Sequence, residues 1–223
     1  MVIFVGAMDV EVQAICRLCE DVEEKTLRGI KIYEATMKGK EVVIATSGIG
    51  KVNAAMTTAV LLQEYEVEYV VNIGSAGGLK KEQNVGDIVI SEWLTMHDFE
   101  IGQEWGKDER FNVYADVNLL ERAERVLEES AIPCWRGLIL SGDQFITGAE
   151  KFTTIVSRFP EAQAVEMEGY ALAKVCTQFG VPFIVLRALS DIVFKEENAV
   201  DFEKFVAFAS ERSAKFCEKF IVE

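Results

Sequence analysis

Short runs of aliphatic and β-branched residues alternate with segments of helical periodicity along the whole chain, and this alternation constrains the fold more than any other feature. We expect strands at 2–6, 30–37, 41–46, 69–73, 87–91, 137–140 and 182–189. The expected helices are 9–20, 51–65, 117–129, 169–179 and 201–220. Strands that alternate with helices through glycine-rich connections form a sheet covered on both faces, so the pattern predicts an α/β fold.

The sheet is expected to be mixed. Lys38-Gly39-Lys40 separates two strands and is typical of a hairpin turn, so these two strands run antiparallel. The expected architecture is three layers, α/β/α, around a central mixed twisted sheet. A chain of 223 residues, 50% of them hydrophobic, suits one domain spanning 1–223, and no repeat or low-complexity linker divides it.

The charge balance excludes one class of partner. Lysine and arginine total 23 against 37 acids, which gives a net charge of −14 and no basic footprint for nucleic acid. No apolar run approaches the roughly 18 residues that a membrane helix needs, so no membrane partner is expected. The first residues, MVIFVGAM, lack the basic region of a secretory signal. We therefore expect a cytoplasmic protein.

The cysteines argue against metal or disulfide chemistry. Five cysteines are scattered through the chain, an odd count that fits reduced thiols. Cys16-x-x-Cys19 has no second cysteine pair, and the only histidine, His97, is remote in sequence. We expect no metal and no cofactor.

Six segments follow expected strands, where α/β enzymes place their ligand sites. They are 6–11, 47–50, 74–78, 141–146, 165–169 and 190–191. The second, Ser47-Gly48-Ile49-Gly50, is like a dinucleotide loop but has Asn53 in place of the third glycine. For this loop alone, glycines that simply permit tight turns are the favoured explanation. The glycines of 74–78 are more suggestive, because they let a ligand approach the backbone.

Acidic residues in these segments are the candidate catalytic groups. Glu11 lies in the first turn of a helix, where the helix dipole alone can explain a carboxylate. Glu166 and Glu168 flank Met167 and would share one face of an extended segment, with Glu168 near the next helix. Asp191 follows a buried strand, where an N-cap and a catalytic acid are both open.

Two other acids have simpler explanations. His97-Asp98 could suggest a Ser-His-Asp triad, but the chain has no Gly-x-Ser-x-Gly elbow. Asp143, within Ser-Gly-Asp, is expected to stabilise its own loop.

Taken together, the segments resemble one family in order and in composition. The matching stretches are VGAMDVEV (5–12), SGIGKV (47–52), GSAGGL (74–79), VGDIV (85–89), RGLILSGDQFI (136–146), AVEME (164–168) and RALSD (187–191). This ordered set resembles the methylthioadenosine/S-adenosylhomocysteine nucleosidases of the nucleoside phosphorylase type I superfamily.

The resemblance implies a nucleoside phosphorylase-like fold and a role for each matching position. Asp191 matches the general acid at N7 of adenine, Glu11 the carboxylate that activates water, and Glu168 the acid on the ribose hydroxyls. Glu166 and Met167 match residues that line the sugar. The remaining matches are the adenine-stacking Phe145, the base-edge contact Ile146, the pocket residues Met8, Ile49, Ser75, Ala76 and Gly77, and the supporting residues Arg187 and Ser190.

The implied chemistry is hydrolysis without a cofactor. Cleavage of an N-riboside leaves a cationic sugar and an anionic purine, which a protonated acid and nearby carboxylates stabilise. Phosphorylases of this superfamily carry an arginine where this chain has Asn72, so water is the expected nucleophile. The implied substrates are 5'-methylthioadenosine and S-adenosylhomocysteine, and the implied assembly is a homodimer.

Three alternatives stay open. The chain could be an aminodeoxyfutalosine or other adenosine-type nucleosidase, a purine nucleoside phosphorylase, or a noncatalytic nucleoside-binding protein. The first differs from the implied function in the 5' substituent of the substrate, and the second in using phosphate instead of water as the nucleophile. The third would bind the nucleoside without cleaving it. The segment 99–114 departs from the family pattern, and Trp105 and Phe111 could close the 5' pocket there or simply pack.

Overall fold

The computed structural model describes residues 1–100, 108–146, 149–192 and 202–223. The strands are β1 (Val2–Gly6), β2 (Glu20–Leu27), β3 (Ile30–Met37), β4 (Lys40–Thr46), β5 (Tyr69–Gly78), β6 (Ile88–Met96), β7 (Val113–Tyr114), β8 (Cys134–Ser141), β9 (Ala162–Glu166) and β10 (Phe183–Ile192). The helices are α1 (Asp9–Cys16), α2 (Lys51–Glu64), α3 (Val117–Glu129), α4 (Ala149–Arg158), α5 (Gly169–Phe179) and α6 (Phe202–Phe220), with a 3₁₀ turn at Glu109–Phe111.

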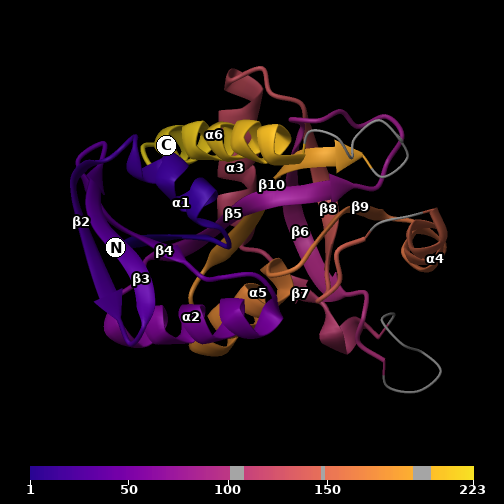
Figure 1. Cartoon of the computed structure of the whole chain (residues 1–223), viewed down its shortest axis with the longest axis horizontal. Coiled ribbons are helices and arrows are strands. Elements are labelled where there is room, and N and C mark those ends of the chain that lie inside the picture. Colours follow the sequence, from indigo (N-terminus) through magenta and orange to yellow (C-terminus); the bar gives the residue numbers. More distant parts are fainter. Residues whose placement is uncertain (101–107, 147–148, 193–201) are drawn as a thin grey trace.

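Helices cover both faces of one mixed sheet, as Figure 1 shows, and the three-layer expectation is confirmed. α1 and α6 pack on one face, and α2 and α5 on the other. Alternation along β1 divides the core: Phe4 joins the cluster under α1 and α6, whereas Ile3 joins the cluster under α2 and α5. α4 packs separately on β8 and β9 through Phe152 and Ile155, together with Phe159 directly after the helix.

One half of the sheet is open and the other half closes on itself. From β5 the sheet continues through β1 and β4 in parallel, and then through β3 and β2 antiparallel. On the other side, β5 pairs both with β10 and with β9, and β10, β6, β8 and β9 complete a ring. The antiparallel pairing of Gly77 and Gly78 with Val165 and Ala164 brings the ends of β5 and β9 together.

Several expected elements are confirmed, one helix is shorter than expected, and the structure contains further elements that the sequence did not predict. The expected turn at 38–40 is confirmed, with φ of +51° at Lys38 and +78° at Gly39. The helix expected at 9–20 ends at Cys16, and Glu20 instead begins β2. β2, β7, α4 and β9 were not expected. Over the described part of the chain, no helix has the length and apolarity to cross a membrane.

Candidate active site

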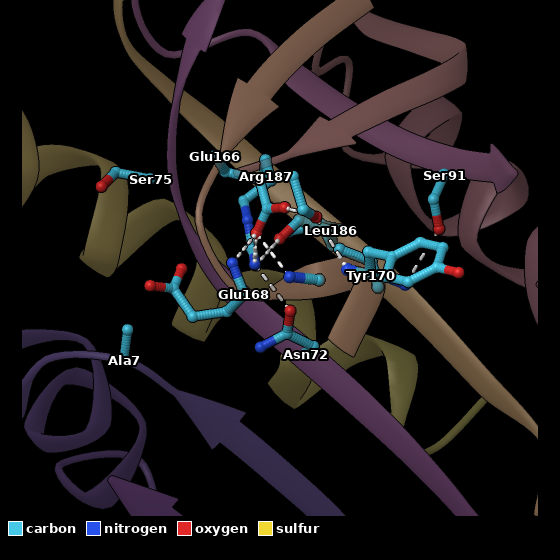
Figure 2. Close-up of polar contacts among 12 residues, drawn as sticks. Ala7, Asn72, Ser75, Ser91, Glu166, Glu168, Tyr170, Leu186 and Arg187 are labelled. Carbon is cyan, nitrogen blue, oxygen red and sulfur yellow. Dashed lines mark hydrogen bonds and ion pairs between the residues drawn. The ribbon is translucent and has the colours of Figure 1, made fainter. Parts of the chain in front are cut away.

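A buried ion pair between Arg187 and Glu166 stands at the centre of the site (Figure 2). Both side chains are 1% exposed. The Nη2 atom of Arg187 donates to Glu166 Oε2. It also donates to the side-chain oxygen of Asn72, at a distance of 2.6 Å. Nη1 donates to the Leu186 carbonyl oxygen at 3.2 Å. Two strands, β9 and β10, are thereby joined by charge inside the closed half of the sheet.

The Glu166 carboxylate is fully occupied by donors. Oε2 accepts from the amides of Glu168 (3.0 Å) and Gly169 (2.7 Å), and Oε1 accepts from the Ser141 hydroxyl. Burial on its own would raise the pKa of Glu166, but Arg187, Ser141 and Gly169 outweigh it and the pKa is lowered. Glu166 is therefore an anion that holds Arg187 and the start of α5 in place.

Glu168 lies in a different environment from Glu166. It is the N-cap of α5, with φ −131° and ψ −38°, and its Oε1 accepts from the Gly50 amide at 2.8 Å. The expectation that the two acids share a strand face is wrong, because β9 ends at Glu166 and the backbone leaves the extended region. In Figure 2 the Glu168 carboxylate points away from the Arg187–Glu166 pair.

The pKa of Glu168 is raised to about 7. Burial is the main cause, and repulsion from Glu166 and Glu11 adds to it, against the attraction of Arg187 and the Gly50 amide. The carboxyl is thus poised to titrate close to neutral pH. Its coupling to Glu11 also places both acids within one electrostatic cluster.

Glu11 connects α1 to β5. It is 1% exposed, and its Oε2 accepts from the amides of Ala7 (2.8 Å) and Met8 (3.0 Å). Its Oε1 accepts from the Ser75 amide at 3.1 Å. Burial raises the pKa of Glu11, against these amides and Arg187. The helix dipole alone therefore does not explain Glu11, because one of its two carboxylate oxygens accepts a hydrogen bond from Ser75 on β5, 64 residues away in the sequence.

Gly74 allows these charged groups to converge. A Cβ at this position would lie 3.1 Å from Glu11 Oε1 and 3.3 Å from Arg187 Nη1. At Gly78 a Cβ would lie 2.7 Å from side-chain atoms of Gln83 and Ile192. Packing against Glu11 and Arg187 requires the glycine at position 74, and packing against Gln83 and Ile192 requires the one at position 78, so neither needs ligand approach to explain it.

Asp191 lies near the end of β10, where the strand pairing is irregular. Leu189 pairs with Ala76 and Asp191 with Gly77, so Ser190 is an extra residue that re-aims the next side chain. The Ser190 hydroxyl donates to Asp191 Oδ1 at 2.8 Å. Burial raises the pKa of Asp191, against this bond. The N-cap alternative is wrong, since β10 continues to Ile192.

The spacing along β5 relates Asp191 to Glu11. Ser75 binds Glu11, and Gly77, two residues further, pairs with Asp191. Two residues span about 7 Å of a strand. The backbone contacts of the two acids therefore lie close together at the end of β5.

The other expected substrate contacts lie in the surrounding loops. Ile49 and Phe145 are 55% and 59% exposed, and Met8, Ile146 and Met167 are half-buried. Ser75, Ala76 and Gly77 occupy the last part of β5. Their contacts with a nucleoside stay predictions. Trp105 lies outside the described residues, whereas the Phe111 ring packs edge-on against Phe99 with centroids 5.4 Å apart.

Two supporting residues were missed as parts of the site. Asn72 donates to the Val5 carbonyl oxygen at 2.9 Å while it accepts from Arg187, and it is 1% exposed. Ser141 accepts from the Tyr170 amide at 2.8 Å while it donates to Glu166. The available signal was a polar side chain inside or directly after a strongly apolar strand.

Comparisons with known proteins match nearly the whole chain. The model of the phosphorylase superfamily matches residues 1–222. A 5'-methylthioadenosine/S-adenosylhomocysteine nucleosidase of Geobacillus sp. (strain WCH70) is 42% identical, over 94% of this chain and 93% of the relative.

Solved structures of this fold are also similar. The same nucleosidase from Neisseria meningitidis, in complex with methylthio-immucillin-A, has a TM-score of 0.92 at 37% identity and covers 99% of this chain and 97% of its own. The futalosine hydrolase of Helicobacter pylori strain 26695 has a TM-score of 0.92 at 33% identity, with the same shares of 99% and 97%.

Proposed function

The chain belongs to the phosphorylase superfamily, and within it we propose a nucleosidase that hydrolyses 5'-methylthioadenosine and S-adenosylhomocysteine to adenine and a 5-thioribose. It is an N-glycosyl hydrolase acting on adenine nucleosides, in one domain spanning residues 1–223. The observation that carries the mechanism is the set of buried acids around Arg187 where β5, β9 and β10 meet.

Asp191 is the proposed general acid. Departure of adenine requires a proton at N7, so the acid must hold its proton near neutral pH. Burial favours the protonated form of Asp191 by raising its pKa. The Ser190 hydroxyl fixes the orientation of the carboxyl group, and Phe145 and Ile146 receive the base.

Glu11 and Glu168 are the proposed partners of the sugar. Glu11 activates the attacking water, and the amides of Ala7, Met8 and Ser75 orient its carboxylate. Glu168 binds the ribose hydroxyls, and its charge stabilises the sugar as positive charge develops in the transition state. Because Glu166 already neutralises Arg187, the remaining acids give the site an excess of negative charge that favours a cationic transition state.

The same charge distribution favours water over phosphate as the nucleophile. Arg187 forms an ion pair with Glu166. At the position where related phosphorylases carry an arginine, this chain has Asn72, whose side chain is hydrogen-bonded to Arg187 and to the Val5 carbonyl oxygen. Glu11 would repel an approaching phosphate. A second candidate, an aminodeoxyfutalosine nucleosidase, is supported by the similarity to the futalosine hydrolase. It would use the same acids and differ only in the 5' substituent.

We also propose a homodimer in the cytoplasm. Val52 and Met56 lie four residues apart on α2 and are 76% and 53% exposed, so they form an apolar patch that a second copy would cover. All five cysteines are free thiols, a state that a reducing compartment maintains. Light scattering of the purified protein tests the dimer.

Adenine release tests the function. The protein is incubated with 5'-methylthioadenosine in phosphate-free buffer, and the products are separated by chromatography and identified by mass. We expect adenine and methylthioribose in equal amounts, unchanged by added phosphate. Formation of a sugar 1-phosphate would instead identify a phosphorylase, and bound but uncleaved nucleoside a binding protein. Preferred turnover of aminodeoxyfutalosine would identify the second candidate.

A further inference from the structure

Lys51 lies beside the site and has no role in the proposed mechanism. It connects the start of α2 to the segments that follow β6 and β8. Its Nζ lies 2.5 Å from Asp98 Oδ1 and 3.7 Å from Asp143 Oδ2. Asp98 follows β6, Asp143 follows β8, and Lys51 begins α2. The second oxygen of Asp98 accepts from the Asp143 amide at 2.7 Å. The Lys51–Asp98–Asp143 cluster is therefore a closed set of contacts between segments far apart in the sequence.

A lysine is unfavourable at this position of a helix. The positive end of the helix dipole lies at the N-terminus of α2, and the first turn of α2 contains no acid to compensate for Lys51. The side chains of Lys51 and Asp98 are only 18% and 11% exposed. Burial alone would raise the pKa of Asp98, but the bonds from Lys51 and the Asp143 amide outweigh it and the pKa is lowered. The cluster thus keeps an ionised pair close to the site.

Two neighbouring amides at the start of α2 connect the cluster to Glu168. The Lys51 amide donates to Asp143 Oδ1 at 2.8 Å, and the Gly50 amide donates to Glu168 Oε1 at 2.8 Å. Gly50 has φ +96°, and a Cβ there would lie 3.1 Å from Asp143 Oδ1. Asp143 therefore binds the amide that directly follows the Gly50 amide, so its contact and that of Glu168 share one short piece of backbone.

We propose that Lys51 is a positioning residue, which through Asp98 and Asp143 fixes the Gly50 amide and with it the Glu168 carboxylate. This inference rests on the proposed function, in which Glu168 binds the ribose. Phe145 lies two residues after Asp143. The same contacts therefore position both the ring proposed to stack on adenine and the Glu168 carboxylate proposed to bind the ribose. In this proposal Lys51 acts through its contacts with Asp98 and Asp143 and not on the substrate.

The titration of Glu168 distinguishes positioning from simple charge. Glu168 is faced by Glu166, Glu11, Arg187 and the Gly50 amide. Replacing Asp98 by Asn removes a negative charge, and by Coulomb's law alone this lowers the pKa of Glu168 or leaves it unchanged. Loss of the Gly50 hydrogen bond raises that pKa. The two explanations therefore predict opposite signs for one variant.

The experiment measures the pKa of Glu168 by carbon-13 NMR in the full chain, for the wild type and for Asp98→Asn, Lys51→Met and Lys51→Arg. Loss of the Glu168 resonance in Glu168→Gln assigns the signal. Lys25→Met is the matched control, since Lys25 bonds Glu34 at 2.7 Å on β2 and β3, away from the site. We expect the pKa to rise by about half a unit or more in Asp98→Asn and Lys51→Met, and to stay constant in Lys25→Met.

Kinetics with 5'-methylthioadenosine give the second readout. A hydrogen bond to a charged group that is lost in the transition state lowers kcat/KM by about tenfold to hundredfold, mainly through kcat. We expect this loss in Lys51→Met and Asp98→Asn, and partial rescue in Lys51→Arg. If Lys51→Met does not fold, Asp98→Asn and Lys51→Arg still decide the question.

The outcomes separate this inference from the proposed function. A constant or lowered pKa of Glu168 in Asp98→Asn overturns the positioning role, whatever the activity. A wild-type protein that releases no adenine overturns the proposed function, while the NMR titration still tests whether Lys51 positions Glu168. A raised pKa together with the kinetic loss supports both.

Discussion

Replacing Glu168 by Gln should stabilise the fold at alkaline pH while it impairs catalysis. The pKa of Glu168 is raised from 4.5 to about 7, so the folded protein binds this proton more tightly than the unfolded chain does. The stability that the proton contributes is complete below pH 4.5 and is lost as the pH rises through 7. Above that pH, the folded protein carries a buried carboxylate beside Glu166 and Glu11.

The magnitude follows from the shift. At about 1.36 kcal/mol per pKa unit, a rise from 4.5 to about 7 corresponds to about 3 kcal/mol of stability that is lost at pH 8. Glutamine carries no charge and its side-chain oxygen can still accept from the Gly50 amide. We therefore expect Glu168→Gln to exceed the wild type by less than about 1 kcal/mol at pH 5 and by about 3 kcal/mol at pH 8, the latter equivalent to about 6–12 °C in Tm.

Urea unfolding at pH 5 and pH 8, at constant ionic strength, measures this difference. Comparing variant and wild type at each pH cancels the titration of the groups that do not interact with Glu168. The exposed Glu121 on α3, changed to Gln, is the control for a surface carboxylate. A variant that is destabilised at pH 8, or shifted equally at both pH values, would refute the reasoning.

Four further expectations concern activity and packing. Asp191→Asn should lower kcat by at least about a hundredfold, because the proton for N7 is lost, while circular dichroism and thermal unfolding show an intact fold. Glu11→Gln should lower kcat by about 10²–10⁴-fold with little change in KM, since it removes activation of water and not binding; steady-state adenine release measures this. The kcat/KM of the wild type should fall below about pH 7 as Glu168 takes up its proton. It should fall again at higher pH once Asp191, whose pKa is raised by burial, loses its proton. A pH profile in which the acid limb survives unchanged in Glu168→Gln would contradict the assignment. Gly142→Ala should lower the free energy of unfolding by about 1–3 kcal/mol, because its Cβ would lie 2.2 Å from His97 Nε2, and denaturant unfolding checks it.

Strong local signals explain which elements could be predicted. The strand Val2–Gly6 and the helices Val117–Glu129 and Gly169–Phe179 have the expected bounds. α3 starts after the N-cap Asp116, and α5 ends at Gly180 in the left-handed region, with φ +70°. β2 carries no such signal, because it is a charged, exposed edge strand whose pairing with β3 only the folded chain provides.

The sequence indicated candidate acids but not the network that holds them. The order of segments along the chain pointed to Glu11, Glu168 and Asp191 as candidates. The roles of Asn72 and Ser141 depend on the closure of the sheet through β5, β9 and β10, which no local pattern encodes. The opposite pKa shifts of Glu166 and Glu168, two residues apart, likewise come from Arg187 facing one and burial dominating the other.

A crystal structure with an uncleavable 5'-thio analogue of adenosine tests the central claim most directly. We predict the Asp191 carboxyl within hydrogen-bond distance of N7, the Glu168 carboxylate on the ribose hydroxyls, and a water between Glu11 and the anomeric carbon. An analogue bound elsewhere, or any of these three side chains turned away from it, would contradict the account.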